Sequence, residues 1–230
     1  MHIPDGFLDP KISTGLIGAA ATVLGLCFAK VAQAVTALAP VKAMATTAGN
    51  ISGGMRRVLT PAGEKTIYKM GMAAALVFAA QMFNFPISGG TSGHLIGGVF
   101  AAVALGPFAG AIVIATVLGV QSLFFADGGL MALGANIINM AVIASIGCYY
   151  IYFFIKKIAP EWIAVSIAAW SSVVLAASAC ALEIGASGTI GLSSVFPAML
   201  KVHVVIGIAE ALITLAFINF FRSMLKEETE

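Results

Sequence analysis

The chain has 230 residues, of which 60% are hydrophobic and 10% charged, and its formal net charge is +2. Soluble domains carry about a quarter charged residues, so this composition, with a mean hydropathy of +1.02, excludes an ordinary soluble domain and indicates a membrane protein. The charge is too small to suggest a nucleic-acid partner, and none is predicted; membrane lipid is the expected surrounding.

Apolar runs long enough to cross a hydrocarbon core of about 30 Å predict seven transmembrane helices, in an all-α bundle that forms one domain over residues 1–230. The runs are continuous rather than alternating, which disfavours a β-barrel. The third run is short, because it lies between Gly93 and the pair Gly106-Pro107, and a re-entrant segment stays an alternative for it. In chain order the predicted segments are Ser13–Leu38, Lys69–Phe85, His94–Leu105, Phe108–Phe125, Ala132–Ile155, Trp162–Ile184 and Leu200–Phe221.

The basic residues predict the orientation of the bundle. With the N-terminus outside, nine lysines and arginines fall in inner loops and the tail, whereas only Lys11 and Lys201 remain outside. Cytoplasmic loops carry such an excess of positive charge, so we expect the N-terminus outside and the C-terminus in the cytoplasm. The nine residues are Lys42, Arg56, Arg57, Lys65, Lys69, Lys156, Lys157, Arg222 and Lys226.

The cytoplasmic connection 40–68, between the first two segments, is the longest stretch that does not span. It mixes Thr, Gly, Ser and basic residues. Two interpretations stay open: a solvated loop or surface helix attracted to anionic lipid, and a docking surface for a cytoplasmic partner. The chain contains no GxxxxGK[ST] phosphate-binding loop, so any ATP hydrolysis is expected on another subunit.

The first 12 residues, MHIPDGFLDPKI, begin with a chelating dipeptide. The Met1 amine, the His2 backbone nitrogen and the His2 ring Nδ1 can bind one ion in fused chelate rings. The backbone nitrogen joins only after losing its proton, and square-planar nitrogen sets favour Ni(II) or Cu(II) over Zn, Mg or Ca. We expect Met1 to be retained, because the bulky His2 hinders its removal.

A planar set needs a fourth nitrogen, and His94 is the predicted one. It lies in NFPISGGTSGHLIGG, directly after a glycine-rich outer connection in which Gly89, Gly90 and Gly93 would let the backbone fold back toward the N-terminus. His203, by contrast, lies inside the seventh segment. Helix capping or packing is the alternative interpretation of His94.

Three stretches resemble one family. MHIPDG is similar to the N-terminal signature of the CbiM/NikM family, the substrate-binding (S) components of energy-coupling factor (ECF) transporters for cobalt and nickel. SGGTSGH resembles the family's second histidine loop, and DGGLMALGANIINMA resembles its Gly-Gly-Leu…Leu-Gly-Ala-Asn stretch. The resemblance is clear from Met1 to about Tyr150 and only hydropathic beyond.

The resemblance implies a transport subunit rather than an enzyme, in a prokaryotic cytoplasmic membrane. It implies capture of a metal ion from the outer side at Met1, His2 and His94, with Ni(II) as the first expectation and Co(II) as the second. The metal is then the transported substrate, and no permanently bound cofactor is expected. It also implies partners: a transmembrane coupling subunit, two ATPase subunits and often a small two-helix subunit. An alternative function is a proton-coupled secondary metal transporter that uses Glu210, His203 and Glu183.

Other polar and small residues receive two interpretations each. Asn136 and Asn139 either orient the folded-in N-terminus around the metal or hold helices together, and Asp5 either fixes the terminal turn or faces water. Glu210 and His203, seven residues apart on one helix face, form either a proton relay or a buried polar contact, whereas solvation suffices for Glu183. A second-segment face of small residues either meets the transmembrane partner or packs internally: Gly71, Ala75 and Ala79.

Overall fold

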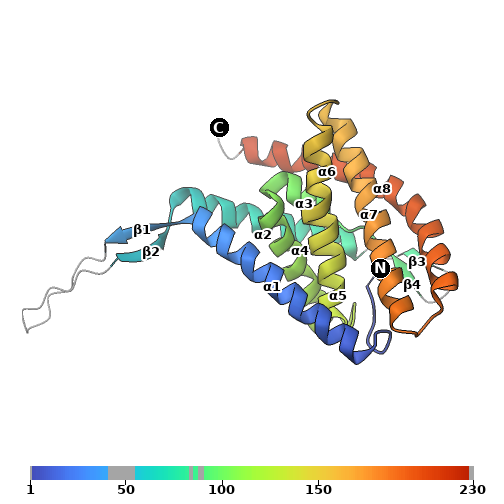
Figure 1. Ribbon diagram of the computed structural model, residues 1–230. Helices are drawn as coiled ribbons and strands as arrows, with labels where there is room; N and C mark the ends of the chain where they lie inside the picture. Colours follow the sequence, from blue (N-terminus) through green and yellow to red (C-terminus); the bar gives the residue numbers. More distant parts are fainter. Residues whose placement is uncertain (1, 41–54, 83–84, 88–90, 228–230) are drawn as a thin grey trace, which may run out of the picture.

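The computed structural model of the chain describes residues 2–40, 55–82, 85–87 and 91–227. Within these ranges the protein is a helical bundle with two short β-hairpins (Figure 1). The elements in chain order are α1 (Pro10–Val35), β1 (Thr36–Pro40), β2 (Met55–Leu59), α2 (Pro61–Gln81), β3 (Phe85–Ile87), β4 (Thr91–Gly93), α3 (Gly98–Leu105), α4 (Pro107–Phe124), α5 (Leu133–Ile137), the π-helix η1 (Ile138–Gly147), α6 (Cys148–Ile155), α7 (Glu161–Ala186) and α8 (Leu192–Glu227).

Seven continuous helices in the described ranges match the seven predicted segments in order, because α5, η1 and α6 run on as one helix. Five are long and apolar enough to cross a membrane: α1, α4, Leu133–Ile155, α7 and most of α8. The expected crossings by the second and third segments are corrected. Glu64, Lys65 and Lys69 make α2 too polar to be one of the five, and α3 has only eight residues. At 1.5 Å per residue it covers about 12 Å, less than half of a hydrocarbon core. The re-entrant alternative suits this length.

Proline and polar caps set where the helices begin. Pro10, Pro61 and Pro107 each occupy the first position of a helix, where the missing N–H leaves no partner unsatisfied. Before the second of these, Thr60 caps α2 by accepting a hydrogen bond from the Gly63 N–H at 3.0 Å. As a result, α2 starts well before the predicted boundary.

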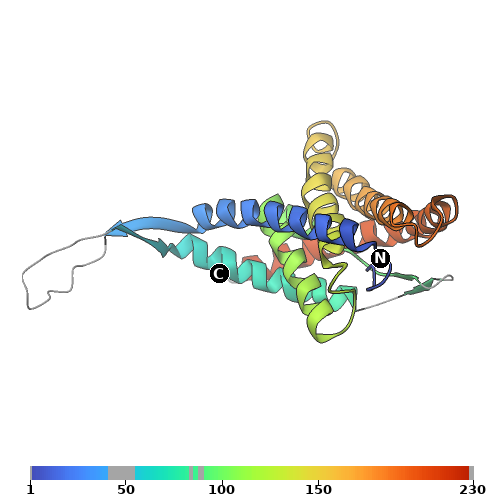
Figure 2. The ribbon, with the colours of Figure 1, turned by 60° about the horizontal axis from the view of Figure 1, so that its bottom comes forward.

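The described part of connection 40–68 includes a β-ribbon rather than only the predicted loop or surface helix. Strands β1 and β2 pair antiparallel, from Thr36 opposite Leu59 to Pro40 opposite Met55. The ribbon continues α1 and α2 away from the bundle (Figures 1 and 2). Residues 41–54 lie outside the described ranges, so the choice between lipid contact and partner docking stays open.

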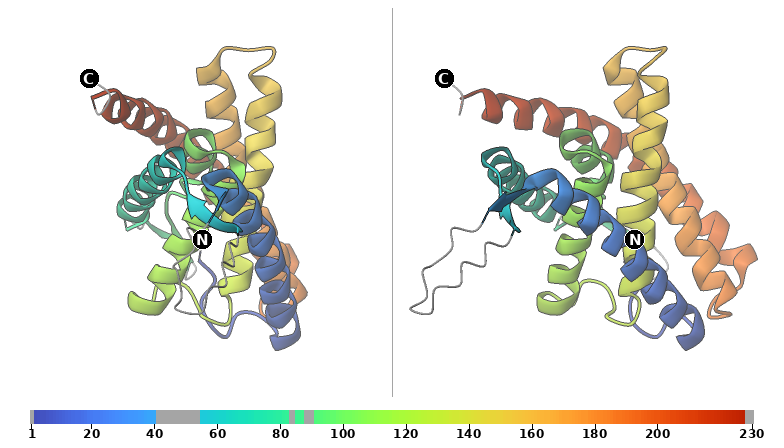
Figure 3. Two further views of the ribbon diagram at one scale, coloured as in Figure 1. Left: turned by 90° about the vertical axis from the view of Figure 1, so that its left-hand side faces the viewer. Right: turned by 60° about the vertical axis from the view of Figure 1, so that its left-hand side comes forward.

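The core of the bundle is formed by α3, α4 and η1, with α7 and α8 packed side by side against them (Figure 3). The Phe100 ring is fully buried and meets the edges of Phe217 and Phe221 on α8 at centroid distances of 5.5 and 5.6 Å. The buried face of α7 consists largely of alanine, which lets helices approach closely in lipid: Ala164, Ala168, Ala169, Ala176, Ala177 and Ala181.

Candidate metal centre

The N-terminal residues fold into the bundle and are held there by α5. The backbone N–H of Ile3 donates to Asn136 Oδ1 at 2.8 Å, and Asn136 Nδ2 donates back to the Ile3 carbonyl at 3.2 Å. The same carbonyl accepts from the Gly129 N–H at 2.9 Å. Asn136 therefore fixes the residue that follows His2.

The turn between α4 and α5 forms a close cradle for these residues. The carboxylate of Asp5 accepts hydrogen bonds from the backbone N–H groups of Leu130 and Met131 at 3.2 and 2.8 Å, so it fixes the terminal turn. A side chain at Gly129 would overlap the Asp5 carboxylate. Gly128 has φ +94°, which side chains rarely adopt, and a Cβ there would lie 3.2 Å from Asn136 Nδ2, closer than ordinary contact.

His2 and His94 meet inside the bundle. Their ring centroids are 4.4 Å apart, with the ring planes at 48°. The His2 side chain is 3% exposed, and His94 is fully buried. Segments far apart in the sequence thus place two imidazoles together in the interior.

The hydrogen bonds of the two rings determine which nitrogens hold lone pairs. His94 Nδ1 lies 2.8 Å from the Leu95 carbonyl oxygen, and His2 Nδ1 lies 2.8 Å from Asp127 Oδ1. Both partners are acceptors, so the proton of a neutral ring lies on Nδ1 in this arrangement and the lone pair on Nε2. Within the described part of the chain, both Nε2 atoms are buried without a hydrogen-bond partner.

Burial also keeps the His94 ring neutral. His94 lies in the connection before α3, outside the five candidate spans. Removal from solvent lowers the pKa of its imidazole well below the usual value. A neutral imidazole is the form that binds a metal ion.

The segment 94–98 has irregular backbone, and side chains from other helices satisfy its polar groups. Gln81 Nε2 on α2 donates to the Ile96 carbonyl at 2.7 Å. Ser145 Oγ on η1 donates to the Gly98 carbonyl at 2.9 Å. Buried non-helical backbone needs such internal partners for its polar groups. These bonds therefore hold the stretch that carries His94.

Glu210 and His203 each have a partner of their own. Both carboxylate oxygens of Glu210 accept backbone hydrogen bonds, from Ile96 at 2.9 Å and Gly97 at 2.8 Å. His203 Nδ1 donates to the Met199 carbonyl at 2.7 Å. In the described ranges no hydrogen bond joins Glu210 to His203, so the geometry does not form the direct proton relay considered from their spacing.

Asn139 and Glu183 form a contact with each other. Asn139 Nδ2 donates to Glu183 Oε2 at 2.7 Å, and the glutamate is only partly exposed. The expectation that solvent accounts for Glu183 is corrected by this contact. The Asn139 amide nitrogen contacts this carboxylate rather than the N-terminal residues, which Asn136 binds.

Asp127 was not among the predicted site residues. It stands in the DGGLMALGANIINMA stretch, directly before the two glycines of the cradle. The only sequence signal is an acidic residue beside a glycine pair between two apolar runs. That pattern does not indicate His2 as its contact, 125 positions away.

The remaining predicted residues are placed as follows. Gly71, Ala75 and Ala79 are all exposed on α2 in the isolated chain. Met1 lies outside the described residues, as do Gly89 and Gly90. Among the described residues, no group of three or more His, Cys, Asp or Glu side chains is arranged to hold a metal ion.

A family model described as cobalt uptake substrate-specific transmembrane region matches residues 35–228. A putative fused nickel transport protein, NikMN, of Archaeoglobus fulgidus is 36% identical over 96% of this chain and 65% of its own length. A probable fused nickel transport protein, LarMN, of Lactiplantibacillus plantarum is 34% identical, with 96% and 64% covered. The cobalt transport protein CbiM of Sorangium cellulosum is 30% identical, with 67% and 72% covered.

Solved structures share the fold over nearly the whole chain. The crystal structure of a truncated transition metal transporter superposes with a TM-score of 0.80 at 30% identity, covering 97% of this chain and 99% of that one. A second transition metal transporter structure gives 0.79, with 97% and 93% covered. This chain spans slightly less than two thirds of the length of the two fused nickel transport relatives.

Proposed function

The chain belongs to the family of cobalt uptake substrate-specific transmembrane regions, and from that premise we propose that it captures a divalent transition-metal ion for import. The proposed preferred ion is Ni(II), followed by Co(II). The proposed role of the chain is the substrate-specific subunit of an ATP-driven ECF transporter. One observation carries the proposal. The buried imidazole rings of His2 and His94 have their centroids 4.4 Å apart, and among the described residues the Nε2 atom of each ring has no hydrogen-bond partner.

The proposed donors are the Met1 amine, the His2 backbone nitrogen, one His2 ring nitrogen and one His94 ring nitrogen. A chelate that includes the His2 backbone nitrogen takes Nδ1 of the same residue, which faces Asp127 in the structure. A half-turn of the ring about Cβ–Cγ exchanges the two ring edges without moving the backbone, and this turn is part of the proposal. Asp5 and Asn136 hold the chelating residues in place, and Asn139 acts through its contact with Glu183.

A planar set of four nitrogens favours Ni(II), because low-spin Ni(II) gains most from that geometry. Co(II) gains less and binds in a distorted arrangement. Cu(II) binds at least as tightly by the Irving–Williams order, so its exclusion depends on its scarcity as a free ion. Zn(II) prefers a tetrahedron, which the fused chelate rings do not supply without releasing the amide.

The proposed partners are a transmembrane coupling subunit, two ATPase subunits and a small two-helix membrane subunit. The face of Gly71, Ala75 and Ala79 meets the coupling subunit, since small exposed residues permit close helix contact in lipid. The basic residues of the connection and of the α6–α7 turn then face the cytoplasm of a prokaryotic cell. The metal enters from the opposite side, where the N-terminus is folded in.

A Ni(II) titration of the purified protein tests the amine ligand. A version tagged only at the C-terminus is compared with one that carries a short N-terminal extension, both in detergent. The extension should abolish high-affinity binding and leave the thermal unfolding midpoint unchanged, because it converts the Met1 amine into an amide. Equal Ni(II) affinity in the two versions would exclude the amine as a ligand.

The spectrum of the same complex tests the planar geometry. We expect a yellow, diamagnetic nickel complex that weakens steeply as pH falls, because protons compete for the amine, the amide and the rings. A paramagnetic octahedral spectrum, or zinc binding tighter than nickel binding, would show that the amide keeps its proton. In that case His2 would bind through Nε2 with Asp127 on its other nitrogen, an arrangement common for metal-ligating histidines.

A further inference from the structure

Glu210 is a fully buried acidic residue of α8, one of the five candidate spans. Its carboxylate is hydrogen-bonded to the segment that follows His94. Its side chain lies on α8 and is 1% exposed. An ionisable group in such a place is expensive unless it has partners. The two carboxylate oxygens of Glu210 take one backbone N–H each, from Ile96 and from Gly97. The carboxylate therefore spans two consecutive peptide groups like a bracket.

The backbone that Glu210 binds begins two residues after His94 and also contacts α2. Gly97 has φ +71° and stands directly before the first residue of α3. A Cβ at Gly97 would collide with the Val77 side chain on α2, so α2 closes that side. Gln81 on α2 holds the Ile96 carbonyl, the polar group that Glu210 does not reach. The direction in which His94 projects thus depends on a backbone clamped between α2 and α8.

We propose that Glu210 is a positioning residue for metal capture: by holding the Ile96 and Gly97 N–H groups it sets the place of the His94 ring relative to His2. The inference rests on the proposed function, because it assigns Glu210 a role in the same site. Glu210 does not touch the metal in this scheme. It acts through the backbone of segment 94–98.

The test is Ni(II) affinity of Glu210→Gln, measured by titration of the purified full chain. Glutamine keeps one acceptor oxygen, but its amide N–H₂ turns a donor toward the second backbone N–H. One hydrogen bond is lost and two donors face each other. Loss of a residue that orients a metal ligand weakens binding by about 10–100-fold, and we expect a fall in that range.

Thr214→Val is the matched control. Thr214 lies one turn further along α8 and is buried to the same degree as Glu210, and valine keeps its shape. We expect its Ni(II) affinity to stay within about twofold of the unsubstituted protein, even where the unfolding temperature drops. A folded Glu210→Gln protein with the affinity of this control would overturn the proposal.

A double-mutant cycle with His94→Ala separates positioning from general stability. If Glu210 acts through His94, then Glu210→Gln should weaken binding much less in the His94→Ala background than alone, because the ring it positions is gone. Equal losses in both backgrounds would show that Glu210 only supports the fold, and would overturn the positioning role. Absence of Ni(II) binding by the unsubstituted protein would instead contradict the proposed function itself.

Glu210→Asp provides a second variant in case Glu210→Gln does not fold. Aspartate keeps the charge, but its chain is shorter by one methylene and reaches only one of the two N–H groups. Its Ni(II) affinity should fall between those of the unsubstituted protein and Glu210→Gln, with the same non-additivity in the His94→Ala background. Unchanged Ni(II) affinity for a folded Glu210→Asp protein would contradict a positioning role for the two hydrogen bonds from Ile96 and Gly97.

Discussion

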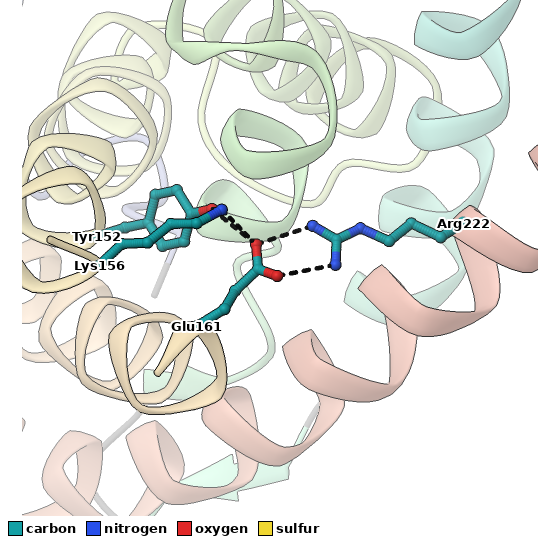
Figure 4. A network of polar contacts seen from close by, with 4 residues as sticks. All are labelled: Tyr152, Lys156, Glu161 and Arg222. Carbon is teal, nitrogen blue, oxygen red and sulfur yellow. Dashed lines mark hydrogen bonds and ion pairs between the residues drawn. The ribbon is translucent and has the colours of Figure 1, made fainter. Parts of the chain in front are cut away.

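Two polar clusters of the bundle differ in what their side chains bind. In the metal-centre cluster, defined by His94, Asn136 and Glu210, each side chain is buried and bonds to backbone groups of irregular segments. In the Glu161 cluster, Tyr152 and Lys156 from one helix end and Arg222 from α8 gather around Glu161 of α7 (Figure 4). There the contacts join side chains to side chains.

The Glu161 cluster is the more exposed of the two. The side chains of Lys156 and Arg222 are 46% and 50% exposed. Arg222 reaches both oxygens of Glu161 at 2.9 and 3.1 Å, and the hydrogen bond to Glu161 raises the pKa of Lys156 above its usual value. A raised lysine pKa means that the lysine's contribution to stability is complete at neutral pH and is lost as the pH rises through that raised pKa.

The two clusters therefore have different roles: the Glu161 cluster joins helices, whereas the metal-centre cluster positions the segments around the site. Exposed ion pairs contribute about 0–1 kcal/mol, because water and salt screen them. A buried group left unsatisfied costs about 1–3 kcal/mol, and a displaced backbone also moves any ligand that it carries. Substitutions in the metal-centre cluster should therefore change metal binding, whereas those in the Glu161 cluster should change only stability, and slightly.

The largest effect is expected for His94→Ala, which removes a proposed metal ligand. Ni(II) affinity, measured by titration, should fall on the order of 100-fold or more, since losing a ligand is at least as harmful as losing the group that orients one. His203→Ala is the matched control, because that ring is also buried but bonds to the carbonyl of its own helix. The Ni(II) affinity of His203→Ala should be nearly unchanged. A larger loss of affinity for His203→Ala than for His94→Ala would show that the metal binds at His203 rather than at His94.

An intermediate effect is expected for Asn136→Ala. The substitution removes both hydrogen bonds to Ile3 and frees the chain next to His2. We expect a loss of Ni(II) affinity of about 10-fold, the lower end for a group that orients a ligand. The free energy of unfolding should fall by about 1–3 kcal/mol. Lower stability with unchanged affinity would mean that Asn136 only joins segments, as the alternative interpretation holds.

The smallest effect is expected for Arg222→Ala, in the exposed cluster. The free energy of unfolding should fall by about 0–1 kcal/mol at low salt, and by less at high salt, because the added salt screens this exposed ion pair. Ni(II) affinity should not change. A loss of affinity as large as that of Asn136→Ala would remove the distinction between the two clusters and would link the far end of α8 to the metal site.

The order of the helices follows from local properties of the sequence. Apolar run length and the Gly106-Pro107 break predict seven helices in the order observed, since helix formation and burial in lipid depend on neighbouring residues. The pairing of His2 with His94 was predicted from metal chemistry rather than from periodicity. The ribbon of β1 and β2 was missed, because its residues carry no clear alternation.

The partners of the buried polar groups were decided only by the tertiary structure. His2 meets Asp127 across 125 positions, and Glu210 meets Ile96 across 114. No repeat or spacing in the sequence encodes such a pair, because it depends on how whole helices pack. The sequence by itself therefore determined a helical membrane protein and led to the hypothesis that His2 and His94 bind a metal ion. Packing decided which carboxylate holds the segment of each histidine, because a buried polar group must find its partner wherever the fold brings one.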